Sequence, residues 1–270
     1  MRILFCNIAD MRFYQGIIPG IDQPKGGGAY VRREHLATES ENFVRRDFVL
    51  DDQLNSYCFG AFVQKTSVIN LHIERIEGCK HLKDAPSVDG VLVVWCAASH
   101  IVGWYKDAIV YRQYQEEKYE NGAGGEVIYY FNVEANADDC VLLPEKKRQM
   151  QQWYVPHVNV KGATYGFGQA NVWYAQDDTA QDYVKRIIAQ ISKYDGENWA
   201  CGRHVPACVG DIVTVSRGKD PHMMEFTFEM EEKGFRPPVH ELSLGKCVGE
   251  QFEYSGFVYT VTRIETPLLS

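Results

Sequence analysis

One short segment of the sequence combines the side chains that a protein needs to hold a flat, hydrogen-bonding ligand. Gly166–Tyr174 reads GFGQANVWY and carries two amides, Gln169 and Asn171, beside Trp173. An amide offers both a donor and an acceptor, and aromatic faces stack on nucleobases. Proteins that read a modified base hold it outside the duplex with such groups. The segment is therefore a candidate wall of a base-binding pocket. The alternative is a strand with a glycine bulge whose Trp173 packs in the core.

The opposite wall would come from two other parts of the chain. Val91–Arg112 predicts a buried strand as far as Ala98, a short break, and a second strand. Too few residues separate these strands for a crossover helix, so we expect them to be antiparallel. Because side chains alternate along a strand, only some of the rings can face one pocket, and the others belong to the core. The predicted contacts from this side are Asn7, Tyr30, Trp95, Trp104 and Tyr105.

Charge and composition limit the kind of nucleic-acid contact. The formal net charge of the 270 residues is −8. This argues against sequence-independent binding to DNA, because such binding needs many phosphate contacts. A local basic rim is sufficient to read one base, and solvated surface charge is the alternative explanation for each basic residue. The candidate phosphate rim is Arg32, Arg33, Lys106 and Arg112.

The eight cysteines are scattered along the chain and favour a reduced compartment. Cys201, His204 and Cys208 have metal-like spacing, with Cys247 as a distant fourth ligand. Structural zinc usually takes two close pairs of ligands, and the second pair is missing here. We therefore expect these residues to be part of a linker and a strand entry, and we predict neither a metal nor a cofactor.

The elements that position these residues are predominantly strands. Arg2–Ile8 predicts a strand, 10–30 a long loop, and Tyr57–Val63 a strand with Val68–Ile73 as its hairpin partner. Short strands are also predicted at Glu126–Val133 and Cys140–Leu143, with a loop at 118–125. Strands at such spacing are typical of a barrel or a sandwich.

One helix and a second domain complete the predicted organisation. Apolar residues recur at helical spacing from Ala180 to Ile191, with Thr179 as the expected N-cap. Beyond residue 197 the sequence pattern predicts a small module made of strands, at 209–215, 224–230, 249–254 and 256–264. We therefore predict a recognition domain over 1–197 and a small β-rich domain over 198–270.

The order of several motifs resembles a known group of proteins. CNIAD, GGGAY, VDGVLVVW, IVGWYKDAIVYR, YFNVEANADDCVLLP and YGFGQANVWYA together resemble the N-terminal region of bacterial HNH-endonuclease proteins, which precedes a nuclease module. The likeness covers about the first 175 residues. The same part is more distantly similar to the EVE, YTH and SRA domains of the PUA-like superfamily. VGDIVTV and LGKCVGEQFEYSGFVYTVTRI resemble the FKBP-like C-terminal domain of Gre-type transcript-cleavage factors.

These resemblances imply an α+β fold. The implied architecture is a PUA-like mixed β-barrel with packed helices, followed by the small FKBP-like domain. They also imply recognition of a modified base in DNA, as the specificity module of a restriction or defence system that works with a separate nuclease or effector. No HNH module is visible after Asn171, so we expect no nuclease activity from this chain.

Two other classes of function stay open. A DNA-processing enzyme, a nuclease or glycosylase, would use Asp10 with His35 or Glu41, although no spacing selects them. A protein-interaction module would dock a polymerase or an effector through 221–230 or 236–239. No apolar run is long enough to cross a membrane, and we expect a cytoplasmic protein.

Overall fold

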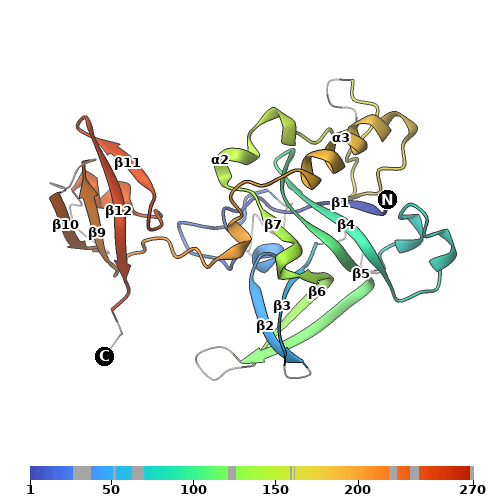
Figure 1. The fold of residues 1–270 in the computed structure, drawn as a ribbon, viewed down its shortest axis with the longest axis horizontal. Helices are drawn as coiled ribbons and strands as arrows, with labels where there is room; N and C mark the ends of the chain where they lie inside the picture. Colours follow the sequence, from blue (N-terminus) through green and yellow to red (C-terminus); the bar gives the residue numbers. More distant parts are fainter. Residues whose placement is uncertain are drawn as a thin grey trace. The chain divides into compact units, whose positions relative to one another are not determined.

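The computed structural model divides the chain into two compact units, and strands predominate in both (Figure 1). The first unit comprises Met1–Ile17 and Asp22–Arg203, and the second comprises Ile18–Ile21 and His204–Ser270. The structure describes residues 1–26, 38–50, 53–62, 70–120, 126–158, 160, 162–218, 224–231 and 237–267, without the side chains of 50, 119, 120, 126 and 127.

The first unit is built on one large mixed sheet. Its strands run in the order β2-β3-β6-β5-β4-β1-β8, and β7 pairs with β5. β1 and β4 are parallel, whereas the other pairs in this sheet are antiparallel. The strands are β1 (Ile3–Asn7), β2 (Arg45–Leu50), β3 (Gln53–Gly60), β4 (Ser87–Ala97), β5 (His100–Glu120), β6 (Glu126–Asn136), β7 (Cys140–Leu142) and β8 (Val172–Trp173).

The predicted α+β class is confirmed, but the predicted closed barrel is wrong. Within the described part of the chain, β2 pairs only with β3 and β8 only with β1, so the sheet keeps two edges. The N-terminal strand causes this arrangement, because β1 lies between β4 and β8 and does not join the sheet to β2. The first unit is an open, mixed sheet.

Two separate apolar cores cover the two faces of this sheet. Alternation along β4 sends Val93 and Trp95 to one face and Val94 to the other. The first core also holds Tyr105, and the second holds its neighbour Trp104. The rings of the hairpin therefore divide between two cores, as the alternation predicts.

Helix α3 (Gln181–Ser192) packs against the second core. Figure 1 shows this helix beside β1. It buries Tyr183, Val184, Ile187 and Ile191, which confirms the helix predicted from the spacing of apolar residues. The predicted cap is wrong. Thr179 lies inside a preceding 3-10 helix, Asp178–Ala180, which takes up the first turn.

The hairpin predicted for Tyr57–Val63 with Val68–Ile73 is wrong in its described part. β3 pairs with β2 and β6, and Ile73 opens the 3-10 helix Ile73–Arg75. Residues 118–120 extend β5, where a loop was expected. The remaining short helices of the first unit are α2 (Glu145–Arg148) and the 3-10 helices Thr38–Glu41, Lys80–Leu82, Ala137–Asp139, Gln151–Trp153 and Trp199–Cys201.

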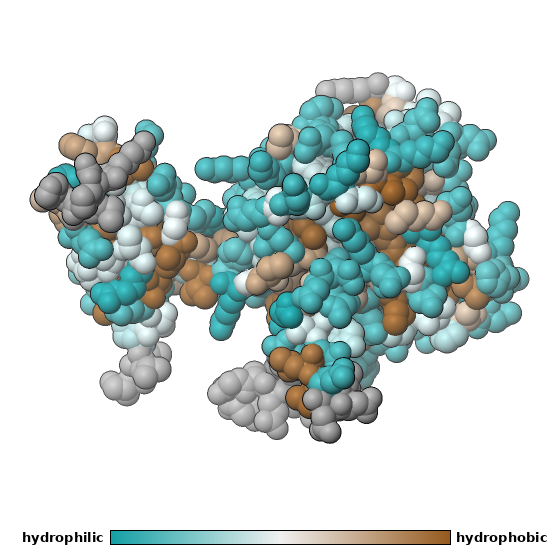
Figure 2. All heavy atoms as spheres, viewed as in Figure 1, coloured by the Kyte–Doolittle hydropathy of each residue, from teal (hydrophilic) through white to brown (hydrophobic). Residues whose placement is uncertain are grey.

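The β2–β3 hairpin ends in an apolar tip. Val49 and Leu54 lie opposite each other across the two strands and are 73% and 70% exposed. Figure 2 shows hydrophobic residues gathered at this end of the hairpin. Such cross-strand pairs stabilise the hairpin locally, outside both cores.

The second unit is a four-stranded antiparallel sheet in the order β10-β9-β12-β11. Its core contains Val213, Val215, Phe252 and Val261, and His240 stacks on Phe228 at 3.8 Å between ring centroids. All four predicted strands are present. The elements are β9 (Ile212–Arg217), β10 (Met224–Glu229), α4 (Pro238–Ser243), β11 (Gln251–Tyr254) and β12 (Phe257–Glu265).

Candidate functional site

Three of the predicted pocket residues belong to the core. Trp95, Trp104 and Tyr105 each have an exposed fraction of 0%. The packing around them is tight, since a Cβ added to Gly60 would lie 2.4 Å from the Trp95 ring. A Cβ on Gly103 would lie 2.3 Å from the Val141 carbonyl oxygen. The prediction that these rings line an open pocket is therefore corrected, because the middle of the sheet leaves no room for a ligand.

The GFGQANVWY segment lies one strand away from the hairpin. β1 separates them, with Phe5 paired to Val94 on one side and to Trp173 on the other. The Trp173 ring contacts the Phe5 ring at 4.7 Å between centroids and is 6% exposed. Trp173 thus packs mainly in the second core, and only its margin is accessible.

A pocket opens beside β8, the edge strand of the sheet. Its lining comes from Val172–Tyr174 and from two further segments, 71–75 and 166–171, which we call its walls. It gathers two of the predicted base-binding residues, Asn171 and Trp173. We call it the β8 pocket: it has a volume of about 290 Å³ and is lined by Leu71, His72, Arg75, Gly166, Gly168, Ala170, Asn171, Val172, Trp173 and Tyr174.

Arg75 and Tyr174 form a flat, cationic surface in this pocket. The Arg75 guanidinium carbon lies 4.5 Å from the centroid of the Tyr174 ring, within the range of a cation–π contact. Burial raises the pKa of Tyr174 to about 12, so the phenol keeps its proton near neutral pH. Arg75 therefore lies against an uncharged ring.

Arg112, predicted for the phosphate rim, instead anchors a wall of the β8 pocket. Its guanidinium donates to the Glu74 carboxylate at 2.9 Å and to the carbonyls of Ala85 and Lys83 at 3.0 and 2.6 Å. Further bonds reach the carbonyls of Leu71 and Leu82. Because these bonds use its donors inside the protein, the assignment of Arg112 to a DNA-facing rim is corrected. Arg112 fixes the 71–85 segment to β5.

Gly166 allows the other wall to fold back on the chain. Its φ is +115°, and an added Cβ would lie 2.0 Å from the Pro156 carbonyl oxygen. The turn brings the Phe167 amide to the Pro156 oxygen at 3.0 Å and the Val158 amide to the Phe167 oxygen at 2.8 Å. The close contact that requires glycine at position 166 is therefore made with the protein's own backbone.

A second pocket lies at the carboxyl ends of the parallel strands β1 and β4. We call it the polar pocket, because its lining carries carboxyl, imidazole, hydroxyl, amide and amine groups. The carboxyl ends of parallel strands are where ligands bind in open α/β sheets. The pocket has a volume of about 340 Å³ and is lined by Asn7, Ile8, Asp10, Lys25, Gly26, Ala98, Ser99 and His157.

The two pockets adjoin each other through backbone contacts. The Asn7 amide donates to the Asn171 carbonyl at 2.7 Å, which joins the lining of the polar pocket to that of the β8 pocket. His157 lies in the polar pocket, and the Cβ position of Gly166 in the β8 pocket is 3.1 Å from its backbone nitrogen. The linings of the two pockets are therefore in contact through backbone atoms.

Two ionisable groups in the polar pocket have shifted pKa values. Burial raises the pKa of Asp10, against the opposite effects of Arg148 and Lys25. Burial lowers the pKa of His157, whose Nε2 is buried without a hydrogen-bond partner among the described residues. A carboxyl group with a raised pKa and an imidazole with a lowered pKa thus line one cavity, and such shifts are concentrated at functional sites.

The backbone around Asp10 is firmly held. Asp10 and Lys25 exchange both backbone hydrogen bonds, at 2.7 and 2.9 Å. The buried Arg148 donates to the carbonyls of Met11 and Arg12 at 2.7 and 2.6 Å. The position of Asp10 is therefore set by the fold before any ligand binds.

The hairpin turn at the rim of the polar pocket has an unusual sequence. Ala98 and Ser99 have φ values of +46° and +64°. Two-residue hairpin turns of this type normally contain Asn-Gly, because residues with larger side chains resist positive φ. Backbone strain of this kind is concentrated at functional sites.

The other predicted site residues are dispersed. Gln169 is exposed between two lining residues of the β8 pocket, and Asn7 lines the polar pocket. Lys106 is half-buried on β5 and lines neither pocket. Tyr30, Arg32 and Arg33 lie outside the described residues.

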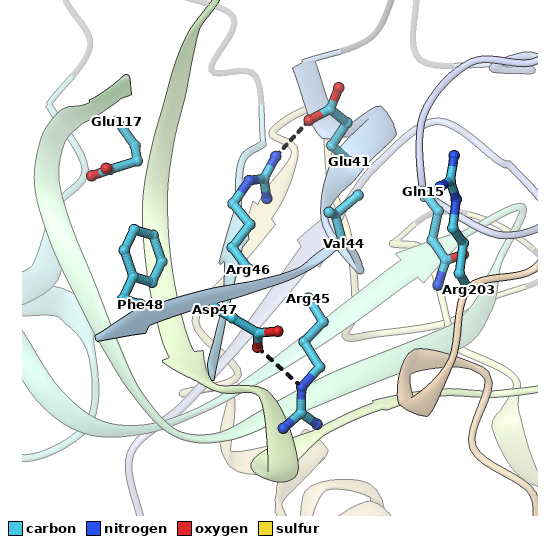
Figure 3. A pocket seen from close by; sticks show the side chains of 9 residues that line it. All are labelled: Gln15, Glu41, Val44, Arg45, Arg46, Asp47, Phe48, Glu117 and Arg203. Atoms are coloured by element: carbon cyan, nitrogen blue, oxygen red, sulfur yellow. Dashed lines mark hydrogen bonds and ion pairs between the residues drawn. The ribbon is translucent and has the colours of Figure 1, made fainter. Parts of the chain in front are cut away.

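A third cavity, of about 580 Å³, is rich in arginine but not in net positive charge (Figure 3). Arg46 pairs with Glu41, and Arg45 lies 3.6 Å from Asp47 and 3.0 Å from Asp138. Figure 3 shows Glu41 and Asp47 among the arginines, with Phe48 and Glu117 on the other side. The acids offset the charge of Arg45 and Arg46, so this cavity does not favour phosphate.

The residues considered for zinc do not form a cluster. Cys201 is exposed in the first unit, whereas Cys208 and Cys247 belong to the second. Across the described residues, no three His, Cys, Asp or Glu side chains are arranged to hold a metal ion. None of the helices in that part of the chain is long and apolar enough to span a membrane.

Sequence reasoning missed His72, Arg75, Ser99 and His157. His157 and the glycine turn that faces it had no motif to mark them, and residues 71–73 were assigned to a strand. The available signal was Asp10, which was considered for catalysis but was paired with His35 or Glu41. Of these, His35 lies outside the described residues, and Glu41 lines the arginine-rich cavity.

Comparisons with known proteins found no match to a family model, to a curated protein or to a solved structure. The resemblance to HNH-associated specificity regions and to PUA-like readers therefore stays a prediction.

Proposed function

We propose that the first unit recognises a modified base in DNA, and that the base lies in the β8 pocket. The observation that carries this proposal is the Arg75–Tyr174 surface beside Asn171 in a pocket of about 290 Å³. Stacking surfaces and amides are the groups that hold an extruded base. The resemblance to the specificity regions of modification-dependent endonucleases supports the same function, with a separate nuclease or effector as partner.

The groups of the pocket have separable roles in this proposal. The Arg75 guanidinium stacks on one face of the base, as it already stacks on Tyr174. The Asn171 amide pairs with the hydrogen-bonding edge of the base. Small residues at Gly168 and Ala170 leave space for a substituent on the ring, since a Cβ added to Gly168 meets nothing within 4 Å.

The test measures equilibrium binding of the full chain to four duplexes of one sequence. They carry cytosine, 5-methylcytosine, 5-hydroxymethylcytosine or its glucosylated form at one position. We expect one modified duplex to bind at least about tenfold more tightly than the plain one, corresponding to about 1.4 kcal/mol. Equal, salt-sensitive affinity for all four would refute base recognition, because it would reflect phosphate contacts alone.

A pair of variants places the base in the β8 pocket. Arg75→Ala removes the stacking cation, and we expect it to abolish the preference for the modified duplex. Lys185→Ala is the matched control, since it removes an exposed cation from α3 on the same unit. A preference that survives Arg75→Ala, or an equal loss in both variants, would place the base elsewhere.

A further inference from the structure

The polar pocket has the groups for a chemical step that base recognition does not use. Asp10, Asn7, Ser99 and His157 line it, and it adjoins the β8 pocket through the bond between Asn7 and Asn171. We propose that this pocket hydrolyses the N-glycosidic bond of the recognised nucleotide, with Asp10 activating a water molecule and His157 donating a hydrogen bond to the departing base. The proposal rests on the proposed function, which brings the nucleotide to the site.

The chemistry of this bond explains why a carboxylate and an imidazole suit it. In a glycosidic transition state the sugar develops positive charge at the ring and C1′. A departing nucleobase develops the matching negative charge. A carboxylate stabilises the cation, and an uncharged N–H donor stabilises the anion without attracting the carboxylate into an ion pair. Burial favours the neutral form of His157, as this role requires.

The step balances with water as the only co-reactant. The water oxygen bonds to C1′ of the deoxyribose, and the C1′–N bond breaks with its electron pair staying on the base. The Asp10 carboxylate takes a proton from the water and passes it to solvent. The base nitrogen takes a proton from solvent, so the products are a free base and an abasic site.

In this proposal one nucleotide spans the two pockets. The base lies on the β8 side, next to the turn at Gly166, and the sugar lies on the side of Asp10. His157 adjoins both, because its ring lines the polar pocket and its backbone nitrogen faces the Gly166 turn. Lys25 is exposed on the lining of the polar pocket, where a flanking phosphate would meet it.

The experiment incubates the full chain with the four duplexes and with their modified single strands. Hot alkali then converts abasic sites to strand breaks. We expect breaks only at the modified position and only after alkali. Asp10→Asn should lower the rate of base release by about 10²–10⁴-fold, the usual contribution of a general base. His157→Asn should lower it by at least about tenfold. The binding of the modified duplex by each variant is measured in parallel, and release rates are compared at saturating protein, so that lost release is separated from lost binding.

Exposed residues of the same types supply the controls. Asp84→Asn and His81→Asn change an exposed Asp and an exposed His outside both pockets, and they should release base at the unaltered rate. Circular dichroism and thermal unfolding show whether each variant is folded. If Asp10→Asn does not fold, Asp10→Ser takes its place.

Three outcomes would overturn this assignment. Binding of the modified duplex without base release would remove the hydrolase and leave recognition standing. Base release that persists in both Asp10→Asn and His157→Asn would place the reaction elsewhere. Failure to discriminate among the duplexes in the binding assay would refute the proposed function, and with it the hydrolase.

Discussion

The β4–β5 hairpin and the Gly166–Tyr174 segment look alike in sequence but not in the fold. Both combine large aromatic residues with glycine, and both were candidates for the same pocket. The hairpin lies in the middle of the sheet, and the rings of Trp95, Trp104 and Tyr105 are inaccessible in the cores on its two faces. The segment ends in an edge strand, and its open side forms a pocket. Position in the sheet, more than residue type, decides whether an aromatic side chain can meet a ligand.

The largest expected effect distinguishes core from pocket directly. Trp104→Ala removes a fully buried ring from the second core, and we expect it to lower the free energy of unfolding by about 3–5 kcal/mol. Arg75→Ala, in the β8 pocket, should change it by less than about 1 kcal/mol. Urea unfolding of the two variants measures both values. If Trp104→Ala and Arg75→Ala destabilised the fold equally, the distinction between a buried hairpin and an accessible pocket would be wrong.

An intermediate effect is expected where the pocket wall is anchored. Arg112→Met keeps the length of the side chain but leaves several carbonyls of residues 71–85 without a donor, at a cost of about 2–3 kcal/mol. Hydrogen exchange should accelerate in residues 71–85 and stay slow in β4. Arg112→Lys should give a similar result because an ammonium cannot reproduce the planar fork. Unchanged exchange in 71–85 would show that the wall is held by other contacts.

The smallest effect is a dependence on pH in the same wall. Burial alone would raise the pKa of Glu74, but bonds from its own backbone amide, His72 and Arg112 lower it to about 2. A carboxyl whose pKa is lower in the folded state stabilises the fold above its ordinary value, 4.5, and that contribution disappears as the pH falls toward 2. Glu74→Gln should therefore flatten the stability profile between these limits. If the free energy of unfolding of Glu74→Gln depends on pH as steeply as that of the unaltered chain, other carboxyl groups cause the pH dependence.

The periodicity of apolar residues predicted many of the individual strands and the helix. It did not predict how strands that are distant in the sequence pair with each other. Period-two and period-3.6 patterns identified β1, β6, β7, α3 and the four strands of the second unit. The parallel pair β1–β4 joins Ile3 to Leu92 across the chain, and no turn signal marks such a pairing. The open sheet and the polar pocket both depend on that pair, so neither could be predicted.

The candidate site shows the same limit. Asn171 and Trp173 were predicted because they lie within one short segment. The wall at 71–75 was missed because Arg112 holds it there through the carbonyls of Leu71, Leu82, Lys83 and Ala85, and backbone acceptors carry no sequence signal. His157 was missed because the turn at Gly166 brings it into place through backbone contacts.

The turn at Ala98 and Ser99 has a consequence for how this protein can change. Each residue holds a left-handed conformation that costs an L-residue about 1–2 kcal/mol relative to the usual backbone. Asn-Gly at the same two positions would recover part of this free energy, so a chain selected for heat resistance alone has a simple route to greater stability. That route replaces Ser99 and alters the rim of the polar pocket. Selection for thermal stability and selection for the pocket would therefore act in opposite directions on these two residues.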